Sequence, residues 1–120
     1  MAGKPRVLRV RERIRDEIAR AITTKLSDPR LAGIWVTAVD IDDGLELATV
    51  LVRHVSKEAA KPKEVLKGLE SAKPKLRSIV AASLGIRKAP DLRFRWDDGM
   101  EKALRVETLL DEISRENRSK

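Results

Sequence analysis

Apolar residues in this chain recur with two periods, one typical of helices and one typical of strands. Steps of three and four residues run through 6–26 and again from about 63 to about 84. Between them lie two runs rich in β-branched residues, 34–41 and 45–55. Steps of three or four keep side chains on one face of a helix, whereas β-branched residues favour strands. The pattern therefore predicts a helix, two strands and a second long helix.

The turn signals agree with this order. SDP at 27–29 follows the first helix, and a residue before proline is biased away from helical angles. DDG at 42–44 separates the two strands and predicts an antiparallel hairpin. Both faces of the hairpin are partly apolar, so the sequence does not identify the buried face. Pro62 stands near the start of the second helix, a position that suits proline.

A third strand is expected over 91–97. Three apolar residues, Leu92, Phe94 and Trp96, alternate there with Arg93 and Arg95, as in a half-buried strand. The following segment has helical spacing and predicts a short final helix. The expected fold is α+β: one domain spanning 1–120, in the order α-β-β-α(kink)α-β plus a short C-terminal helix. It has a three-stranded sheet with its helices on one face, and about 1–5 and 115–120 are expected to be flexible.

Pro74 lies inside the second predicted helix, yet the helical spacing of the apolar residues continues on both sides of it. Proline lacks the N–H of a helix interior, and its ring clashes with the carbonyl four residues back. The apolar steps nevertheless stay at three or four on both sides of it. This predicts a helix that bends at Pro74 and keeps both halves on the sheet. The alternative is two separate helices, with Pro74 at the first position of the second.

The net charge and its distribution indicate the class of partner. The net charge is +7 and the pI about 10.1, which favours a polyanionic partner such as nucleic acid or an anionic membrane surface. The alternative is a protein whose basicity is incidental. The excess lies in two segments, 1–30 with nine Lys/Arg against four Asp/Glu, and 57–88 with nine against three. A folded domain would therefore have a basic side.

The sequence lacks the residues that several classes of function require. There is no cysteine, which excludes disulfides and thiolate chemistry and fits a reducing cytoplasm. His54 is the only histidine, so a multi-histidine metal site is excluded. No glycine-rich phosphate loop, apolar signal segment or membrane-length apolar run is present. We expect a non-enzymatic protein without metal or cofactor.

The candidate RNA-binding residues are cations in or beside the two basic segments and on the third strand. Each has a structural alternative: a solvated helix face, an intrahelical ion pair, a favourable cation at a helix end, or a soluble sheet face. The candidates are Lys73, Lys75 and Arg77 at the kink; Arg6, Arg9 and Arg13 on the first helix; Lys61, Lys63 and Lys67; Arg87 and Lys88; and Arg93 and Arg95.

Aromatic residues are scarce, at 2% of the chain. Trp96 alternates with predicted core residues and is expected in the core. For Trp35 the sequence leaves two possibilities, packing in the core and stacking on a base. Proteins that bind single strands usually rely on several aromatic side chains. The composition therefore favours recognition of the nucleic-acid backbone and shape.

Four parts of the chain form a recognisable series. They are RVRERIRDEIARAI with SDPRL, VTAVDIDDGLELATVLV, LRSIVAASLGIRKAPDLRFRWDD, and the apolar residues Val106, Leu109 and Leu110 near the end. In this order they resemble a type II KH domain, and more narrowly the ribosome-binding factor A family. Nucleic-acid-binding KH domains place a Gly-rich loop along the nucleic-acid backbone. The family has a tight Ala-x-Gly kink instead, which matches Ala72, Lys73 and Pro74, with proline in place of glycine.

The resemblance implies a bacterial ribosome assembly factor. Its implied partners are the free 30S subunit and 16S rRNA, in the region of the rRNA's 5′-terminal helix. Its implied role is late 30S maturation and 16S rRNA processing, as a cytoplasmic monomer with no membrane partner and no catalysis. Two other classes stay open: a general KH-like module for single-stranded nucleic acid, and a basic protein-interaction domain.

Overall fold

The computed structural model describes residues 5–56 and 58–97. Its elements are α1 (Pro5–Thr24), the 3₁₀ turn η1 (Pro29–Leu31), β1 (Ile34–Ile41), β2 (Leu47–His54), α2 (Pro62–Leu84) and β3 (Asp91–Trp96). The predicted α+β order is confirmed for this part of the chain, and the bounds differ from the predicted ones by two residues or fewer. The predicted final helix and the tail 115–120 lie outside the described residues.

The sheet has three strands in the order β1-β2-β3. β1 and β2 form the predicted antiparallel hairpin, with a bulge between Val36 and Ala38, and β3 runs parallel to β2. At the hairpin turn, Oδ1 of Asp42 accepts hydrogen bonds from the backbone N–H groups of Glu46 (2.7 Å) and Leu47 (2.8 Å). The acidic turn thus fixes the register of the hairpin.

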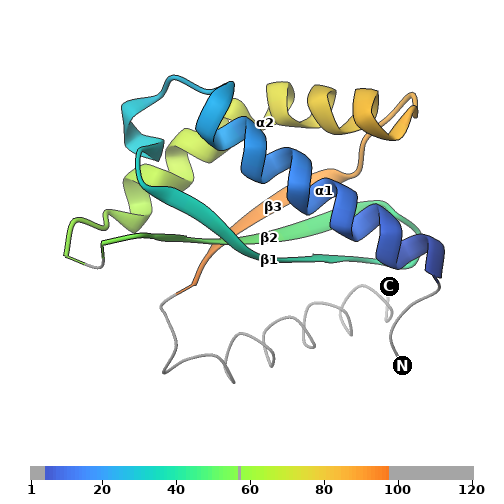
Figure 1. Ribbon diagram of the computed structural model, residues 1–120, viewed down its shortest axis with the longest axis horizontal. Helices are drawn as coiled ribbons and strands as arrows, with labels where there is room; N and C mark the ends of the chain where they lie inside the picture. The colour runs from blue at the N-terminus through green and yellow to red at the C-terminus, as the bar shows by residue number, and fades with distance from the viewer. Residues whose placement is uncertain (1–4, 57, 98–120) are drawn as a thin grey trace.

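Both helices lie on the same face of the sheet (Figure 1). The hydrophobic core lies between these two layers and takes residues from every element. Its most buried members, at 0% or 1% exposure, are Ile14, Ile18, Ala21, Ala48, Val50, Val52, Leu69, Leu76, Val80 and Leu92. The expectation of one helical face over a three-stranded sheet is therefore confirmed for the described chain.

Helix α2 is continuous through Pro74, so the alternative of two separate helices is wrong. Figure 1 shows the two halves of α2 running in different directions. The buried residues Leu69 and Leu76 flank Pro74, and neither has any exposed surface, whereas the proline itself is exposed. Packing thus holds the helical phase on both sides of the proline.

Replacing Pro74 with alanine should raise the free energy of unfolding by about 1 kcal/mol or more. Alanine restores the N–H that the carbonyl of Glu70 lacks and is a better helix residue by about 3 kcal/mol. Proline's restriction of the unfolded chain offsets about 0.4–1 kcal/mol of this gain. Urea denaturation tests it, with Ser78→Ala as an exposed control on the same helix. A loss of stability would mean that packing around Leu69 and Leu76 requires proline's bend.

Candidate nucleic-acid interface

The turn between α1 and β1 is fixed by a carboxylate–guanidinium pair. Oδ2 of Asp28 accepts from Nη2 of Arg30 at 2.6 Å, and Oδ1 accepts from the backbone N–H of the same residue at 2.9 Å. Hydrogen bonds from the arginine side chain, together with this backbone bond, hold the pKa of Asp28 below its usual value. The same pairing raises the pKa of Arg30. The guanidinium of Arg30 is therefore paired within the turn, where its charge stabilises the turn.

This turn packs closely against the first half of α2. A β-carbon at Gly68 would lie 3.1 Å from Oδ2 of Asp28 and 3.1 Å from Cδ2 of Leu31. A glycine thus allows the turn to lie against the helix just before the kink. Between the turn and the kink is a hollow of about 310 Å³, lined in part by Ser27, Ser71 and Lys75.

Lys75 ties the second half of α2 to the end of α1. Its Nζ donates to the backbone carbonyl of Lys25 at 2.9 Å, one residue beyond the end of α1. Carbonyls at a helix C-terminus lack intrahelical donors, so a cation there is favourable. Lys75 remains exposed, so its ammonium group keeps donors free for a ligand in the hollow.

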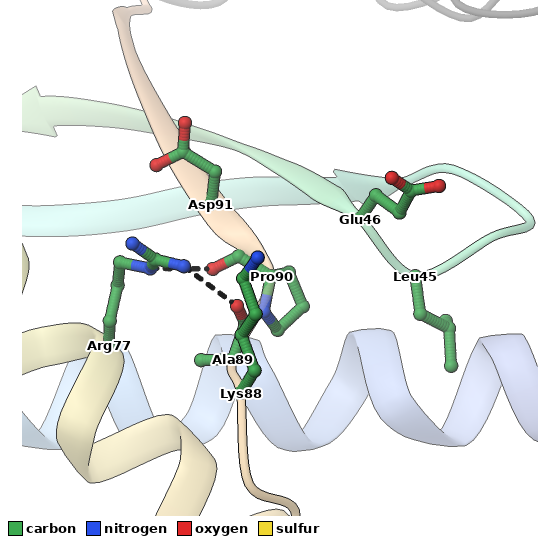
Figure 2. A pocket seen from close by; sticks show the side chains of 7 residues that line it. All are labelled: Leu45, Glu46, Arg77, Lys88, Ala89, Pro90 and Asp91. Atoms are coloured by element: carbon green, nitrogen blue, oxygen red, sulfur yellow. Dashed lines mark hydrogen bonds between the residues drawn. The ribbon is translucent and has the colours of Figure 1, made fainter.

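Arg77 has a structural role. Its Nε donates to the carbonyl of Pro90 at 3.2 Å and its Nη2 to the carbonyl of Ala89 at 3.0 Å, as Figure 2 shows. Both acceptors belong to the segment that leads into β3, and both residues are buried. The guanidinium thereby joins α2 to the start of β3, at the edge of a pocket of about 570 Å³.

Lys73 is held by acidic neighbours. Its Nζ lies 3.1 Å from Oε1 of Glu70 and 4.0 Å from Oδ1 of Asp91, and its side chain is 24% exposed. The cations that the sequence places around the kink therefore all have partners within the molecule. Lys75 is the one that stays exposed, because the other two side chains are half-buried.

On α1 the arginines divide into two groups. Arg11 and Arg15 each lie 3.8 Å from a carboxylate oxygen of Glu12, and Arg20 lies 3.5 Å from Glu17. The candidates Arg6, Arg9 and Arg13 are exposed, and none is ion-paired with an acidic side chain in the described part of the chain. Intrahelical pairing does occur on α1, but it involves the arginines that were not candidates.

Arg13 marks where α1 meets the second half of α2. Its Nη1 lies 3.5 Å from the hydroxyl of Ser83, which in turn donates to Glu17 at 2.9 Å. Together with the bond between Lys75 and Lys25, these contacts show that the two helices run antiparallel there. The exposed cations Arg6, Arg9, Arg13 and Lys75 therefore belong to one helical layer, which we call the helical cationic face.

The remaining candidates are dispersed. Lys61, Lys63 and Lys67 are exposed at or near the start of α2, and Arg87 and Lys88 are exposed beyond its end. Arg93 and Arg95 alternate with the core residues of β3, so they lie on the sheet face opposite the helices. The structure thus separates the predicted set into two surfaces on opposite sides of the sheet.

The two tryptophans differ in how far their side chains are exposed. Trp96 packs against the hydrophobic core, as predicted. Trp35 is 46% exposed, and Cζ of Arg53 lies 5.5 Å from the centroid of its ring. Arg53 was not a candidate, and its place opposite Trp35 becomes visible only in the paired strands.

Within 5–56 and 58–97, no cluster of three His, Asp or Glu side chains is arranged to hold a metal ion. In the same ranges, neither helix combines the length and the hydrophobicity that a membrane span requires.

Comparison with known proteins identifies relatives over most of the chain. The family model described as ribosome-binding factor A matches residues 6–110. Ribosome-binding factor A of Sorangium cellulosum is 44% identical over 110 residues, which cover 90% of this chain and 88% of that protein.

Solved structures have the same fold. The crystal structure of ribosome-binding factor A from Thermus thermophilus has a TM-score of 0.67 at 23% identity, covering 75% of this chain and 93% of its own. A homology model of the Thermus thermophilus factor, fitted into a cryo-EM map of its complex with the 30S subunit, has a TM-score of 0.60 at 24% identity. It covers 72% of this chain and 89% of its own. The KH type II-like α+β fold is thereby confirmed.

Replacing Arg77 with glutamine should lower the free energy of unfolding by about 1.5–3 kcal/mol, because hydrogen bonds from a charged group to the carbonyls of Ala89 and Pro90 are lost. Lys67→Gln removes the same charge from an exposed position of the same helix and should cost no more than about 0.5 kcal/mol. Thermal or urea unfolding of both variants measures the difference. Unchanged stability in Arg77→Gln, with weaker RNA binding, would contradict the structural role.

Proposed function

The chain belongs to the ribosome-binding factor A family, and on that premise we propose that it assists late maturation of the small ribosomal subunit. It binds the free 30S subunit and 16S rRNA and supports processing of that rRNA. The Thermus thermophilus relative fitted into a map of its 30S complex supports the choice of subunit.

The observation that carries this proposal is the helical cationic face. Arg6, Arg9 and Arg13 form no ion pair among the described residues, and all three are exposed on a helix whose other side is in the core. Guanidinium groups in this state can each donate two parallel hydrogen bonds to two oxygens of one phosphate. Phosphate contacts of this kind position a protein on folded RNA without reading its bases.

Lys75 extends this face to the kink. Its ammonium group stands beside the hollow between the α1–β1 turn and α2, where a phosphate would meet a cation and the hydroxyls of Ser27 and Ser71. Lys63, Lys67, Arg87 and Lys88 add exposed positive charge at the two ends of α2. Lys73 and Arg77 contribute to the local potential while their side chains hold the fold.

The finer features follow from the same proposal. The rRNA contact lies in the region of the 5′-terminal helix of 16S rRNA, and the factor acts as a cytoplasmic monomer. It has no catalytic role, because the sequence offers one histidine and no nucleotide-binding glycine loop. Release from the subunit is therefore driven by other factors or by subunit joining.

Co-sedimentation with purified 30S subunits, 50S subunits and 70S ribosomes at two salt concentrations tests the proposal. We expect binding to free 30S subunits alone, and a log–log dependence of affinity on salt with a slope of roughly −4 to −5, as for about six phosphate contacts. Equal binding to all three particles would reduce the function to general RNA affinity. Salt-independent binding would indicate a protein partner instead.

Two double variants of α1 test the helical cationic face with matched charge. Arg6→Gln with Arg9→Gln removes two unpaired guanidiniums, whereas Arg11→Gln with Arg15→Gln removes two that are paired with Glu12. The first pair should weaken 30S binding several-fold and reduce the magnitude of the salt slope by up to about 2. The second should change both much less. Equal effects would mean that net charge, and not this face, governs binding.

A further inference from the structure

We propose that Trp35 and Arg53 form a stacking site for one unpaired RNA base, on the sheet face opposite the helices. The proposal rests on the proposed function, since it assumes that the partner is RNA. It adds a base-contacting site to a protein whose other candidate contacts are with phosphates.

Trp35 is placed on the solvent side by strand alternation. Its neighbours in β1, Ile34 and Val36, are 3% and 5% exposed and belong to the core, whereas Trp35 is 46% exposed. A tryptophan buries a large apolar area when it is placed in a core. Keeping half of the indole in water is therefore a cost to the free protein that a ligand would remove.

Arg53 prepares the indole for a flat ligand. It is the cross-strand partner of Trp35 in the β1–β2 ladder, and its Cζ lies 5.5 Å from the ring centroid, within the range of a cation–π contact. Bases stack on both tryptophan rings and arginine guanidinium planes. A base stacked on the indole would lie close to a guanidinium that is already held at the ring.

The backbone beside the pair is held by a hydrogen bond and by close packing. The N–H of Val55 donates to the carbonyl of Gly33 at 2.9 Å, which extends the ladder beyond Trp35. Gly33 has φ +79°, and a β-carbon there would lie 2.7 Å from Nε2 of His54. The histidine ring thus fills the space under the loop. A stacking platform that does not have to be ordered on binding loses less entropy.

The surroundings favour a base over an apolar protein surface. Two large exposed hydrophobic side chains lie here: Trp35 and, directly after β2, Val55, which is 73% exposed and two residues from Arg53. Leu51 on the same face is fully buried. One indole and one valine make a small apolar patch, whereas surfaces that bind proteins usually expose several hundred Å² of contiguous apolar area. Arg95 is exposed on this face, beside Leu51 in the ladder, and can take the phosphate next to the stacked base.

Charge alone does not make this face an RNA site. Asp40 on β1 and Asp97 after β3 continue the same face in the alternation of the strands, so its charge is mixed. Stacking is therefore the interaction that must supply the binding energy here, in contrast to the helical cationic face. Such stacking changes affinity by about 5- to 100-fold per base when the aromatic residue is removed.

The test uses the full chain carrying Trp96→Phe, so that indole fluorescence reports Trp35 alone. The probes are an eight-nucleotide single-stranded RNA and an abasic oligonucleotide of the same length. We expect the RNA to quench Trp35 and to bind about tenfold more tightly than the abasic chain. With affinity measured by fluorescence anisotropy of labelled oligonucleotides, Trp35→Ala should abolish this difference, and Trp35→Phe should retain part of it. Arg53→Gln should reduce it.

The same variants are then assayed on 30S subunits. Intact binding of the wild type, with weaker binding by Trp35→Ala and partial recovery by Trp35→Phe, would support the site. Equal binding of RNA and abasic chain, with no quenching, would overturn it while leaving 30S binding by the wild type unaffected. Quenching by RNA without any 30S binding would instead overturn the proposed function. If Trp35→Ala loses 30S binding but retains the base-dependent difference, the indole contacts a ribosomal protein and the inference is wrong.

Discussion

The position of β2 at the centre of the sheet is the constraint on which the rest of the structure depends. Ala48, Val50, Leu51 and Val52 have no exposed surface, and the strand is paired on both edges. Its antiparallel partner, β1, is joined to it directly by a hairpin. Its parallel partner, β3, requires a crossover connection. Helix α2 is that crossover. The same connection brings Arg77 to the carbonyls before β3 and Lys73 to Asp91 at the start of β3.

This constraint divides the cations into two kinds. A cation whose side chain reaches a turn or the end of another element finds carbonyl oxygens or carboxylates there, and its charge then stabilises the fold. Lys73, Arg77 and Arg30 belong to this kind. A cation in the middle of a solvent-facing helix side finds such a partner only three or four residues away. Arg6 has no acidic residue at either spacing on α1, and Arg9 has only Glu12, which pairs with Arg11 and Arg15. The charges of Arg6 and Arg9 therefore stay available for a ligand.

The sequence predicted the elements well because each rests on local periodicity and turn chemistry. Even the bend at Pro74 was predictable, since the apolar phase is local information. The parallel pairing of β3, the contact of Lys73 with Asp91 and the partners of Arg77 were not, because they depend on contacts between segments 12 or more residues apart, such as Arg77 with Ala89. The kink residues were therefore predicted as a site on charge alone, although two of the three are half-buried in structural contacts.

The helical cationic face and the stacking site at Trp35 differ in chemistry and lie on opposite sides of the sheet. Phosphate contacts on α1 fall off steeply with salt, whereas stacking on Trp35 depends little on it. A single stacked base binds weakly by itself. Once the helical cationic face holds a large folded RNA, however, a second contact becomes intramolecular and gains from a high effective concentration. In this proposal a single indole in an otherwise aromatic-poor protein is sufficient to add selectivity, because the proposed phosphate contacts on the opposite side supply the affinity.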